Sequence, residues 1–344
     1  MAEQISQNHL SIFLLFSYSE KLFHLRYIHM KIGYPCINNS IPRNASSTFR
    51  LASYSESKMI QTVKDNVFHL HQILRYNVKN NLLFFRISSG LIPFASHPVC
   101  KFAWHKFFQS ELKQIGDYIK RHNIRISMHP DQFVVLNSPN EKIVQNSINE
   151  LKYHCNLLDT MHLDYTAKAQ IHVGGVYGNK VHAIDRFIKT YNNSTQLADD
   201  SIKNRLVIEN DDHLYSLKDC LYINQCTGIP IVFDNFHYEC FVNNTKELKV
   251  KEEVSIRNPL QKAMSTWKIN NDGLPMVDYS SQDIGTIDNY SGVMNRIGKH
   301  TERIDIKSFK YFIKQTEGLD FDIMLEIKDK EISALKALEI VRKK

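Results

Sequence analysis

The feature that most constrains the fold is the alternation of eight short apolar runs with longer amphipathic segments. In the longer segments, apolar residues recur at helical spacing, whereas the short runs are continuously apolar, as in strands buried on both faces. Strands that alternate with helices favour a parallel sheet covered by helices, and eight such units predict a single (β/α)8 TIM barrel. The expected strands are 31–37, 82–88, 125–130, 169–175, 205–210, 230–236, 275–280 and 322–327, and the expected helices include 57–80, 141–161, 182–191 and 216–226.

The composition fits an ordinary globular protein. The chain has 344 residues, of which 43% are hydrophobic and 23% are charged. The net charge of +7 suits a polyanionic partner, although such an excess is also common in proteins that bind none. The six cysteines are scattered and form no Cys-x-x-Cys pair, which predicts neither a disulfide scaffold nor a zinc finger. We therefore expect an intracellular, reducing compartment.

The N-terminal region contains an apolar run, 10–16, that is too short to span a bilayer and lacks the basic segment of a signal peptide. We expect residues 1–29 to be an extension that the protein can dispense with, and residues 30–344 to form the barrel domain. The sequence predicts no association with a membrane, and we expect a monomer.

Chemically active side chains cluster where the expected strands end. Taken singly, a histidine there is usually structural, and an acidic residue often caps the next helix. Taken together, several carboxylates on one rim are costly to bury unless cations neutralise them. A mixed set of histidines and carboxylates suits Zn²⁺ or Mn²⁺ better than Mg²⁺, and the number of ligands suggests a cluster of ions that activates water and clamps a phosphoryl group. The strand-end residues are His129, His172, Glu209, Asp234, His237, Asp278, Glu326 and Lys328, with His97 in the loop after the second strand.

Several long motifs resemble the ultraviolet-damage endonuclease family, which is related to the endonuclease-IV barrels. The most specific are "FFRISSGLIPFASHP" (84–98) and "RISMHPDQFVVLNSP" (125–139), and others run in order along the barrel from Gly33 to Glu331. The resemblance implies a metal-dependent DNA repair endonuclease acting on double-stranded DNA that contains ultraviolet lesions. It would nick the backbone 5′ to cyclobutane dimers and 6-4 photoproducts, and at abasic sites. Its cofactors would be two or three divalent ions, with Mn²⁺ preferred over Zn²⁺ or Mg²⁺.

The resemblance also implies roles for the strand-end residues. His129, His172 and Glu209 would hold one ion, and Glu209 would bridge to a second ion and be central to catalysis. The second ion would be held with Asp234, Glu326 and Asp278, and a third by His237 and His300. His97 would line the same pocket as a metal ligand or a phosphate contact, and Lys328 would neutralise charge in the transition state.

The loop after His129 would sense the damage. In the family a Gln-Tyr pair enters the gap at a lesion, and here the pair is Gln132–Phe133. Phe133 keeps the stacking face but lacks the hydroxyl, and a core aromatic is the alternative. The resemblance further implies that Tyr34 and Asn38 line the lesion pocket. Contacts to phosphate would come from Tyr177 and Lys180, for which an ordinary basic surface loop is the alternative.

The chain departs from the family on the seventh strand, where Met276 and Asp278 replace a lysine and a histidine. An aspartate still offers oxygen ligands to Mn²⁺ or Mg²⁺, whereas methionine offers no charge. Two rival functions stay open: a metal-dependent sugar isomerase on the same barrel, and a non-catalytic protein that binds ultraviolet-damaged DNA. The sequence does not choose among nucleus, cytoplasm and virion.

Overall fold

Eight parallel strands close into a barrel, as the sequence predicts. The computed structural model describes residues 30–244, 255–283 and 298–342. Each strand is hydrogen-bonded to the next along the chain, and the last strand pairs with the first. The strands are β1 (Ile32–Pro35), β2 (Phe84–Ile87), β3 (Arg125–Met128), β4 (Lys168–His172), β5 (Leu206–Glu209), β6 (Ile231–Asp234), β7 (Met276–Tyr279) and β8 (Asp322–Leu325).

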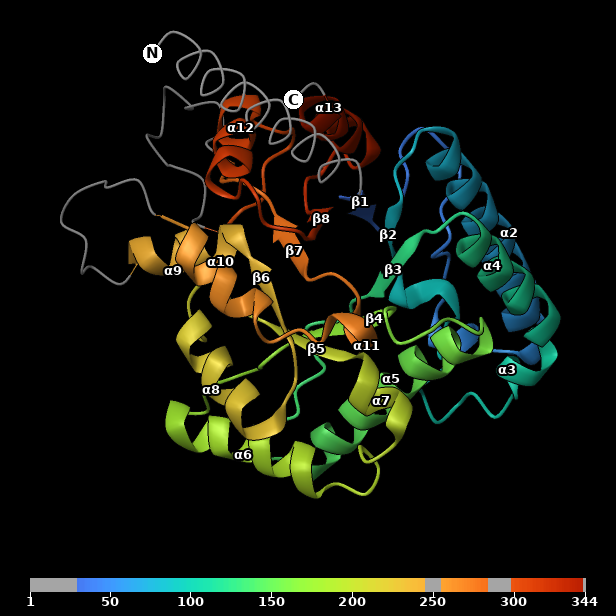
Figure 1. The fold of residues 1–344 in the computed structure, drawn as a ribbon. Helices are drawn as coiled ribbons and strands as arrows, with labels where there is room; N and C mark the ends of the chain where they lie inside the picture. Colours follow the sequence, from blue (N-terminus) through green and yellow to red (C-terminus); the bar gives the residue numbers. More distant parts are fainter. Residues whose placement is uncertain (1–29, 245–254, 284–297, 343–344) are drawn as a thin grey trace, which may run out of the picture.

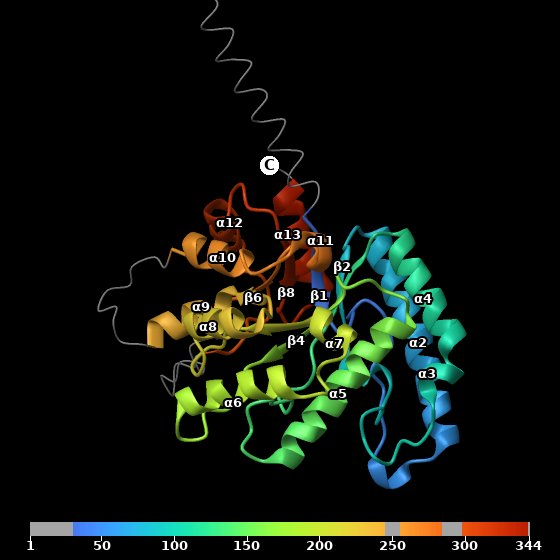
Figure 2. The ribbon, with the colours of Figure 1, turned by 60° about the horizontal axis from the view of Figure 1, so that its bottom comes forward.

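Helices cover the outside of the barrel (Figure 1, Figure 2). The four predicted helices are confirmed as α2 (Glu56–Lys79), α5 (Glu141–Thr160), α6 (Lys180–Asn193) and α8 (Leu217–Thr227). The last helix packs beside β1, where the barrel closes. Further elements were not predicted from the sequence. They are the helices α3 (Trp104–Phe107), α4 (Gln109–Arg121), α7 (Asp200–Arg205), α9 (Asn235–Asn244), α10 (Arg257–Met264), α11 (Ile269–Asp272), α12 (Ile306–Gln315) and α13 (Glu331–Arg342), and the 3-10 turns η1 (Leu51–Ser53) and η2 (Ser89–Leu91).

The interior of the barrel is filled by a layer of side chains from several strands. A methyl group on Gly33 would lie 1.9 Å from the carbonyl oxygen of Phe84, so glycine is required for β1 to approach β2 this closely. Met276 belongs to the same buried layer, so its role on β7 is apolar packing. The layer consists of Phe84, Val207, Val232, Met276 and Met324, with Trp267 beneath.

The amino-terminal end of the barrel is closed by buried charged groups. The Nζ atom of Lys168 donates to Asp272 Oδ1 at 2.6 Å, and Arg125 Nη1 lies 3.4 Å from Asp322 Oδ2. Both cations lie near the ring of Trp267. Because charges at this end of a TIM barrel serve stability, the opposite rim is the place to look for chemistry.

Two expectations concern the ends of the chain and the membrane. The predicted dispensable extension, 1–29, lies outside the described residues. Within the described part of the chain, no helix combines the length and the apolar content needed to cross a membrane.

Candidate metal centre

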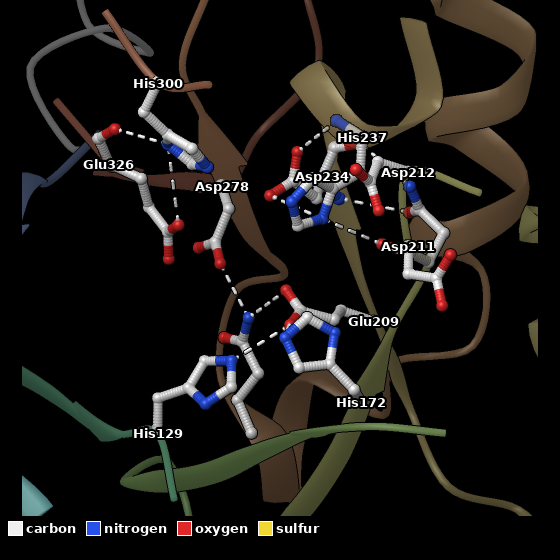
Figure 3. Close-up of polar contacts among 12 residues, drawn as sticks. His129, His172, Glu209, Asp211, Asp212, Asp234, His237, Asp278, His300 and Glu326 are labelled. Atoms are coloured by element: carbon white, nitrogen blue, oxygen red, sulfur yellow. Dashed lines mark hydrogen bonds and ion pairs between the residues drawn. The ribbon is translucent and has the colours of Figure 1, made fainter. Parts of the chain in front are cut away.

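Four neighbouring strands bring histidines and carboxylates to one rim (Figure 3). His129 directly follows β3, His172 and Glu209 end β4 and β5, and Asp234 ends β6. Helix α9 begins immediately after Asp234, so His237 lies within its first turn. The backbone N–H of His237 donates to Asp234 Oδ1 at 2.7 Å, which fixes the Asp234 side chain against the first turn of α9.

The first group of potential ligands consists of His129, His172 and Glu209. The Nε2 atoms of the two histidines lie 2.9 Å and 3.0 Å from Glu209 Oε1. The Nδ1 atom of His129 is 2.8 Å from the carbonyl oxygen of Pro130, an acceptor that requires the proton on Nδ1. Nε2 is therefore the atom free to bind a metal ion. A hydrogen bond from the other ring nitrogen is the usual way in which proteins orient a metal-binding histidine.

The second group shares Glu209 with the first. Ligand atoms of Glu209, Asp234 and His237 all lie within 4.8 Å of one another, as do those of His129, His172 and Glu209. Glu209 and Asp234 are buried, each only 1% exposed. One buried carboxylate therefore stands between two sets of ligands, which is the arrangement of a bridging ligand.

The electrostatics of the two groups indicate a shortage of positive charge. Burial alone would lower the pKa of His172 and of His237, but the neighbouring carboxylates outweigh it and raise each pKa to about 9. Burial, with Glu326 and Glu209 nearby, raises the pKa of Asp234 well above its usual range. Divalent cations would relieve this repulsion, and the mixture of imidazole and carboxylate suits Mn²⁺ or Zn²⁺.

His300 and Glu326 lie beside the two groups. The Nδ1 atom of His300 donates to the backbone oxygen of Glu326 at 2.7 Å, and its ring centre is 5.9 Å from that of His237. Neither residue belongs to a group whose ligand atoms all lie within 4.8 Å of one another. Their predicted roles as ligands therefore stay predictions.

Sequence reasoning missed two buried residues beneath the rim, Arg86 and Gln170. Arg86 Nη2 lies 2.9 Å and 2.8 Å from the two carboxylate oxygens of Asp278, and Nη1 contacts Glu326. Gln170 Nε2 donates to Glu209 and to Asp278, at 2.6 Å each. Burial raises the pKa of Asp278 to about 6, although Arg86 opposes the shift. Because this pKa is still below 7, the carboxylate is ionised at neutral pH.

Two predicted residues are not brought into the centre. The Nζ atom of Lys328 lies 2.5 Å from Glu302 Oε1, and the side chain is partly exposed. This placement does not support the catalytic role expected for Lys328, and the buried cation at the centre is Arg86 instead. His97 is exposed on its loop, where its Nδ1 accepts a hydrogen bond from the N–H of Val99 at 3.1 Å. It belongs to neither group of ligands.

The loop after His129 projects into solvent. The side chain of Phe133 is 74% exposed and Gln132 is exposed beside it, so the alternative of a core aromatic is wrong. Tyr177 is also exposed, and the guanidinium of Arg186 covers its ring at 5.5 Å. Lys180 is paired with Asp219 at 2.5 Å. A phosphate would have to compete with that carboxylate.

Tyr34 and Asn38 lie in a network of buried hydrogen bonds. Both are buried, and the Tyr34 hydroxyl donates to Asn77 Oδ1 at 2.5 Å while accepting from Asn38 Nδ2 at 2.7 Å. The amide oxygen of Asn38 also accepts from the N–H of Ser40. These bonds fix the loop after β1. The sequence offers no signal for this, because Asn77 lies on α2, far along the chain. The role expected for the two residues in a lesion pocket stays a prediction.

Comparison with known proteins identifies close relatives. The model of the family described as UV-endonuclease UvdE matches residues 30–343. The UV DNA damage endonuclease of Clostridium perfringens (strain 13 / Type A) is 38% identical over 313 residues, which are 91% of this chain and 71% of that protein. The crystal structure of SacUVDE superposes with a TM-score of 0.80 at 41% identity, covering 92% of this chain and 99% of that one. Endonuclease IV from Thermus thermophilus shares the fold alone, with a TM-score of 0.56 at 12% identity over 91% of this chain and 98% of its own.

Proposed function

Because this chain belongs to the UV-endonuclease UvdE family and is thus a DNA repair endonuclease, we propose that it cuts the DNA backbone 5′ to ultraviolet photoproducts. The photoproducts would be cyclobutane dimers and 6-4 photoproducts, and abasic sites would be cut as well. The observation that carries the metal-dependent part is the buried carboxylate of Glu209, shared by two groups of potential ligands.

The side chains at the rim fit divalent ions. His129, His172 and Glu209 would hold one ion, and Glu209, Asp234 and His237 a second, with Mn²⁺ as the proposed metal. Burial, together with the charges of Glu326 and Glu209, raises the pKa of Asp234, and a bound cation would offset both effects. When bound, the ions would supply the Lewis acidity that activates water and clamps the scissile phosphate.

The protein's own groups would position this chemistry. Gln170 holds Oε2 of Glu209, which leaves Oε1 toward the two histidines. The Nδ1 proton of His129 is directed to the carbonyl oxygen of Pro130, so the first ligand and the start of the exposed loop are fixed to each other. DNA that moves this loop would therefore also move His129.

Recognition of damage would depend on the exposed loop. A photoproduct weakens stacking, so a side chain can enter the duplex there at lower cost than in intact DNA. The ring of Phe133 is exposed and offers a stacking face, and Gln132 beside it offers amide donors and acceptors. The partner would be duplex DNA, approached by a monomer in a reducing compartment, and the net charge of +7 would favour the encounter.

A nicking assay tests the proposal. Supercoiled plasmid, irradiated or not, is incubated with the protein in Mn²⁺ or in chelator, and we expect relaxation of the irradiated plasmid only when metal is present. Glu209→Gln should abolish nicking and keep most of the affinity for irradiated DNA, whereas Glu302→Gln, an exposed rim glutamate outside both ligand groups, should behave like the parent.

The same assay separates the rival functions. Binding of irradiated DNA by the parent without nicking would support a damage-binding protein. Conversion of a free sugar without nicking would support an isomerase. Equal nicking by Glu209→Gln and the parent would contradict the bridging role of Glu209.

A further inference from the structure

The guanidinium of Arg86 is a buried cation inside the barrel, directly beneath the metal centre. Arg86 follows Phe84 by two residues on β2, so it points inward like that ring but one level nearer the rim. The side chain is almost completely buried, and its partners are Asp278, Glu326 and Gln170. A buried guanidinium is stable only when its charge is matched, and Asp278 and Glu326 supply that match. Both Nη atoms of Arg86 have partners, whereas Nε is buried without one.

The carboxylate of Asp278 is committed to these partners on both oxygens. Oδ1 accepts from Arg86 Nη2 at 2.9 Å, and Oδ2 accepts from Arg86 Nη2 at 2.8 Å and from Gln170 Nε2 at 2.6 Å. Asp278 is fully buried and belongs to neither group of potential metal ligands. A metal ion at Asp278 would have to share oxygens that already accept three hydrogen bonds, and it would lie next to the Arg86 guanidinium.

The rest of β7 offers no replacement ligand. Met276 precedes Asp278 by two residues and is packed in the apolar layer inside the barrel. Strand β7 therefore contributes one buried anion, and that anion is already neutralised. A third metal ion at this corner would meet the positive charge of Arg86 at close range.

Gln170 connects this ion pair to the bridging carboxylate. Its Oε1 accepts from Arg86 Nη2 at 3.0 Å, which directs its Nε2 toward Glu209 Oε2 and Asp278 Oδ2. With the amide oriented in this way, each of its atoms has a partner of the right kind. Arg86 thus reaches Glu209 through one intervening side chain and helps to fix the oxygen that faces the histidines.

We propose that Arg86 acts as a built-in cation of this centre: it neutralises Asp278, positions Glu209 through Gln170, and limits the centre to two metal ions. Asp278 is then the counter-ion of Arg86 and not a metal ligand. The inference rests on the proposed function only in that the rim binds divalent ions. Arg86 is a positioning residue, because it acts on the ligand Glu209 through Gln170.

The test counts bound ions without DNA. Metal-free protein is dialysed against Mn²⁺, the bound metal is measured by mass spectrometry, and titration calorimetry gives the affinities. We expect two ions per chain for the parent and for Asp278→Asn, and fewer for Glu209→Gln. Asp117→Asn, an exposed acid on α4, is the matched control and should also bind two.

Variants of Arg86 test the role of its charge. Arg86→Gln leaves Asp278 and Glu326 without their cation, so we expect it to bind one more Mn²⁺ ion than the parent. Arg86→Lys keeps the positive charge and should still bind two ions. This variant separates the effect of the charge from that of the shape of the guanidinium. Thermal denaturation of each metal-free variant identifies the folded ones, and the double variant Arg86→Gln with Asp278→Asn, which removes both charges, should unfold at a higher temperature than Arg86→Gln alone.

Two results would overturn the inference. One is a third ion bound by the parent and kept in Asp212→Asn, since the separate group of Asp211, Asp212 and His213 could also hold an ion. The other is loss of one ion in Asp278→Asn when the protein is folded. These results are independent of incision. A parent that binds two ions in the expected pattern but does not nick irradiated DNA would contradict the proposed function and leave the role of Arg86 standing. A parent that binds no Mn²⁺ would contradict both.

Discussion

The buried histidine of α5 predicts a loss of stability in mild acid. His154 is fully buried, with Nδ1 donating to the backbone oxygen of Glu150 at 2.8 Å and Nε2 lying 3.0 Å from the Ser89 hydroxyl. Burial lowers its pKa from 6.5 to about 4. Between these values the unfolded chain binds the proton and the folded chain does not. The stabilisation is therefore complete above the unfolded pKa and is lost as the pH falls toward the folded one.

The difference between the two pKa values, 6.5 unfolded and about 4 folded, corresponds to roughly 3 kcal/mol of stability in full and about 2 kcal/mol at a pH near 5. The assay is denaturant unfolding of the metal-free protein near pH 8 and near pH 5. The parent should lose about 2 kcal/mol more than His154→Gln over this interval. His182→Gln, a substitution of an exposed histidine on α6, should match the parent. An equal loss in His154→Gln and the parent would show that the buried histidine does not cause the loss of stability in acid.

Three further substitutions separate sensing from stability. Phe133→Ala should lower the ratio of affinities for irradiated and intact duplex at least several-fold, measured by fluorescence anisotropy, with bound Mn²⁺ unchanged; an unaltered ratio would contradict the sensing role. Gly33→Ala should destabilise the protein by about 3 kcal/mol or more because its methyl group would meet the carbonyl oxygen of Phe84 at 1.9 Å, and normal stability in urea unfolding would show that the barrel can adjust. Asp322→Asn should lower the free energy of unfolding by about 3–5 kcal/mol, because it removes the carboxylate paired with Arg125. This variant should bind as much Mn²⁺ as the parent. A change in metal content would show that the two ends of the barrel are coupled.

The barrel could be predicted because its strands are buried on both faces. Such strands appear as continuous apolar runs, and all eight were found at the correct places. Helix α4 was missed although Leu112, Ile115 and Ile119 have the helical spacing, as was α12, whose Phe309, Phe312 and Ile313 face the core.

The candidate ligands could be predicted because chain order places the strand ends on one rim. His129, His172 and Glu209 come together for this reason, and Asp234 and His237 through the abrupt start of α9. Which residues share a metal ion, and how many ions there are, depends on distances that the sequence does not contain.

The buried network of Arg86, Asp278 and Gln170 could not be predicted from the apolar pattern of the strands. Arg86 stands inside an apolar run, and only the register of β2 against its neighbours shows that it points into the barrel. The sequence equally gives no reason to pair Lys328 with Glu302, or Tyr34 with Asn77, because each pair is brought together by tertiary packing.

Incision at a defined lesion is the direct test of whether this protein cuts DNA 5′ to a photoproduct with the help of metal ions. A duplex with one cyclobutane dimer, labelled at the 5′ end of the damaged strand, is incubated with the protein and Mn²⁺. We expect a single labelled product that ends on the 5′ side of the dimer. We expect no product from the undamaged duplex and none when a chelator is present. Cutting on the 3′ side, equal cutting of undamaged DNA, or undiminished cutting in chelator would contradict this expectation.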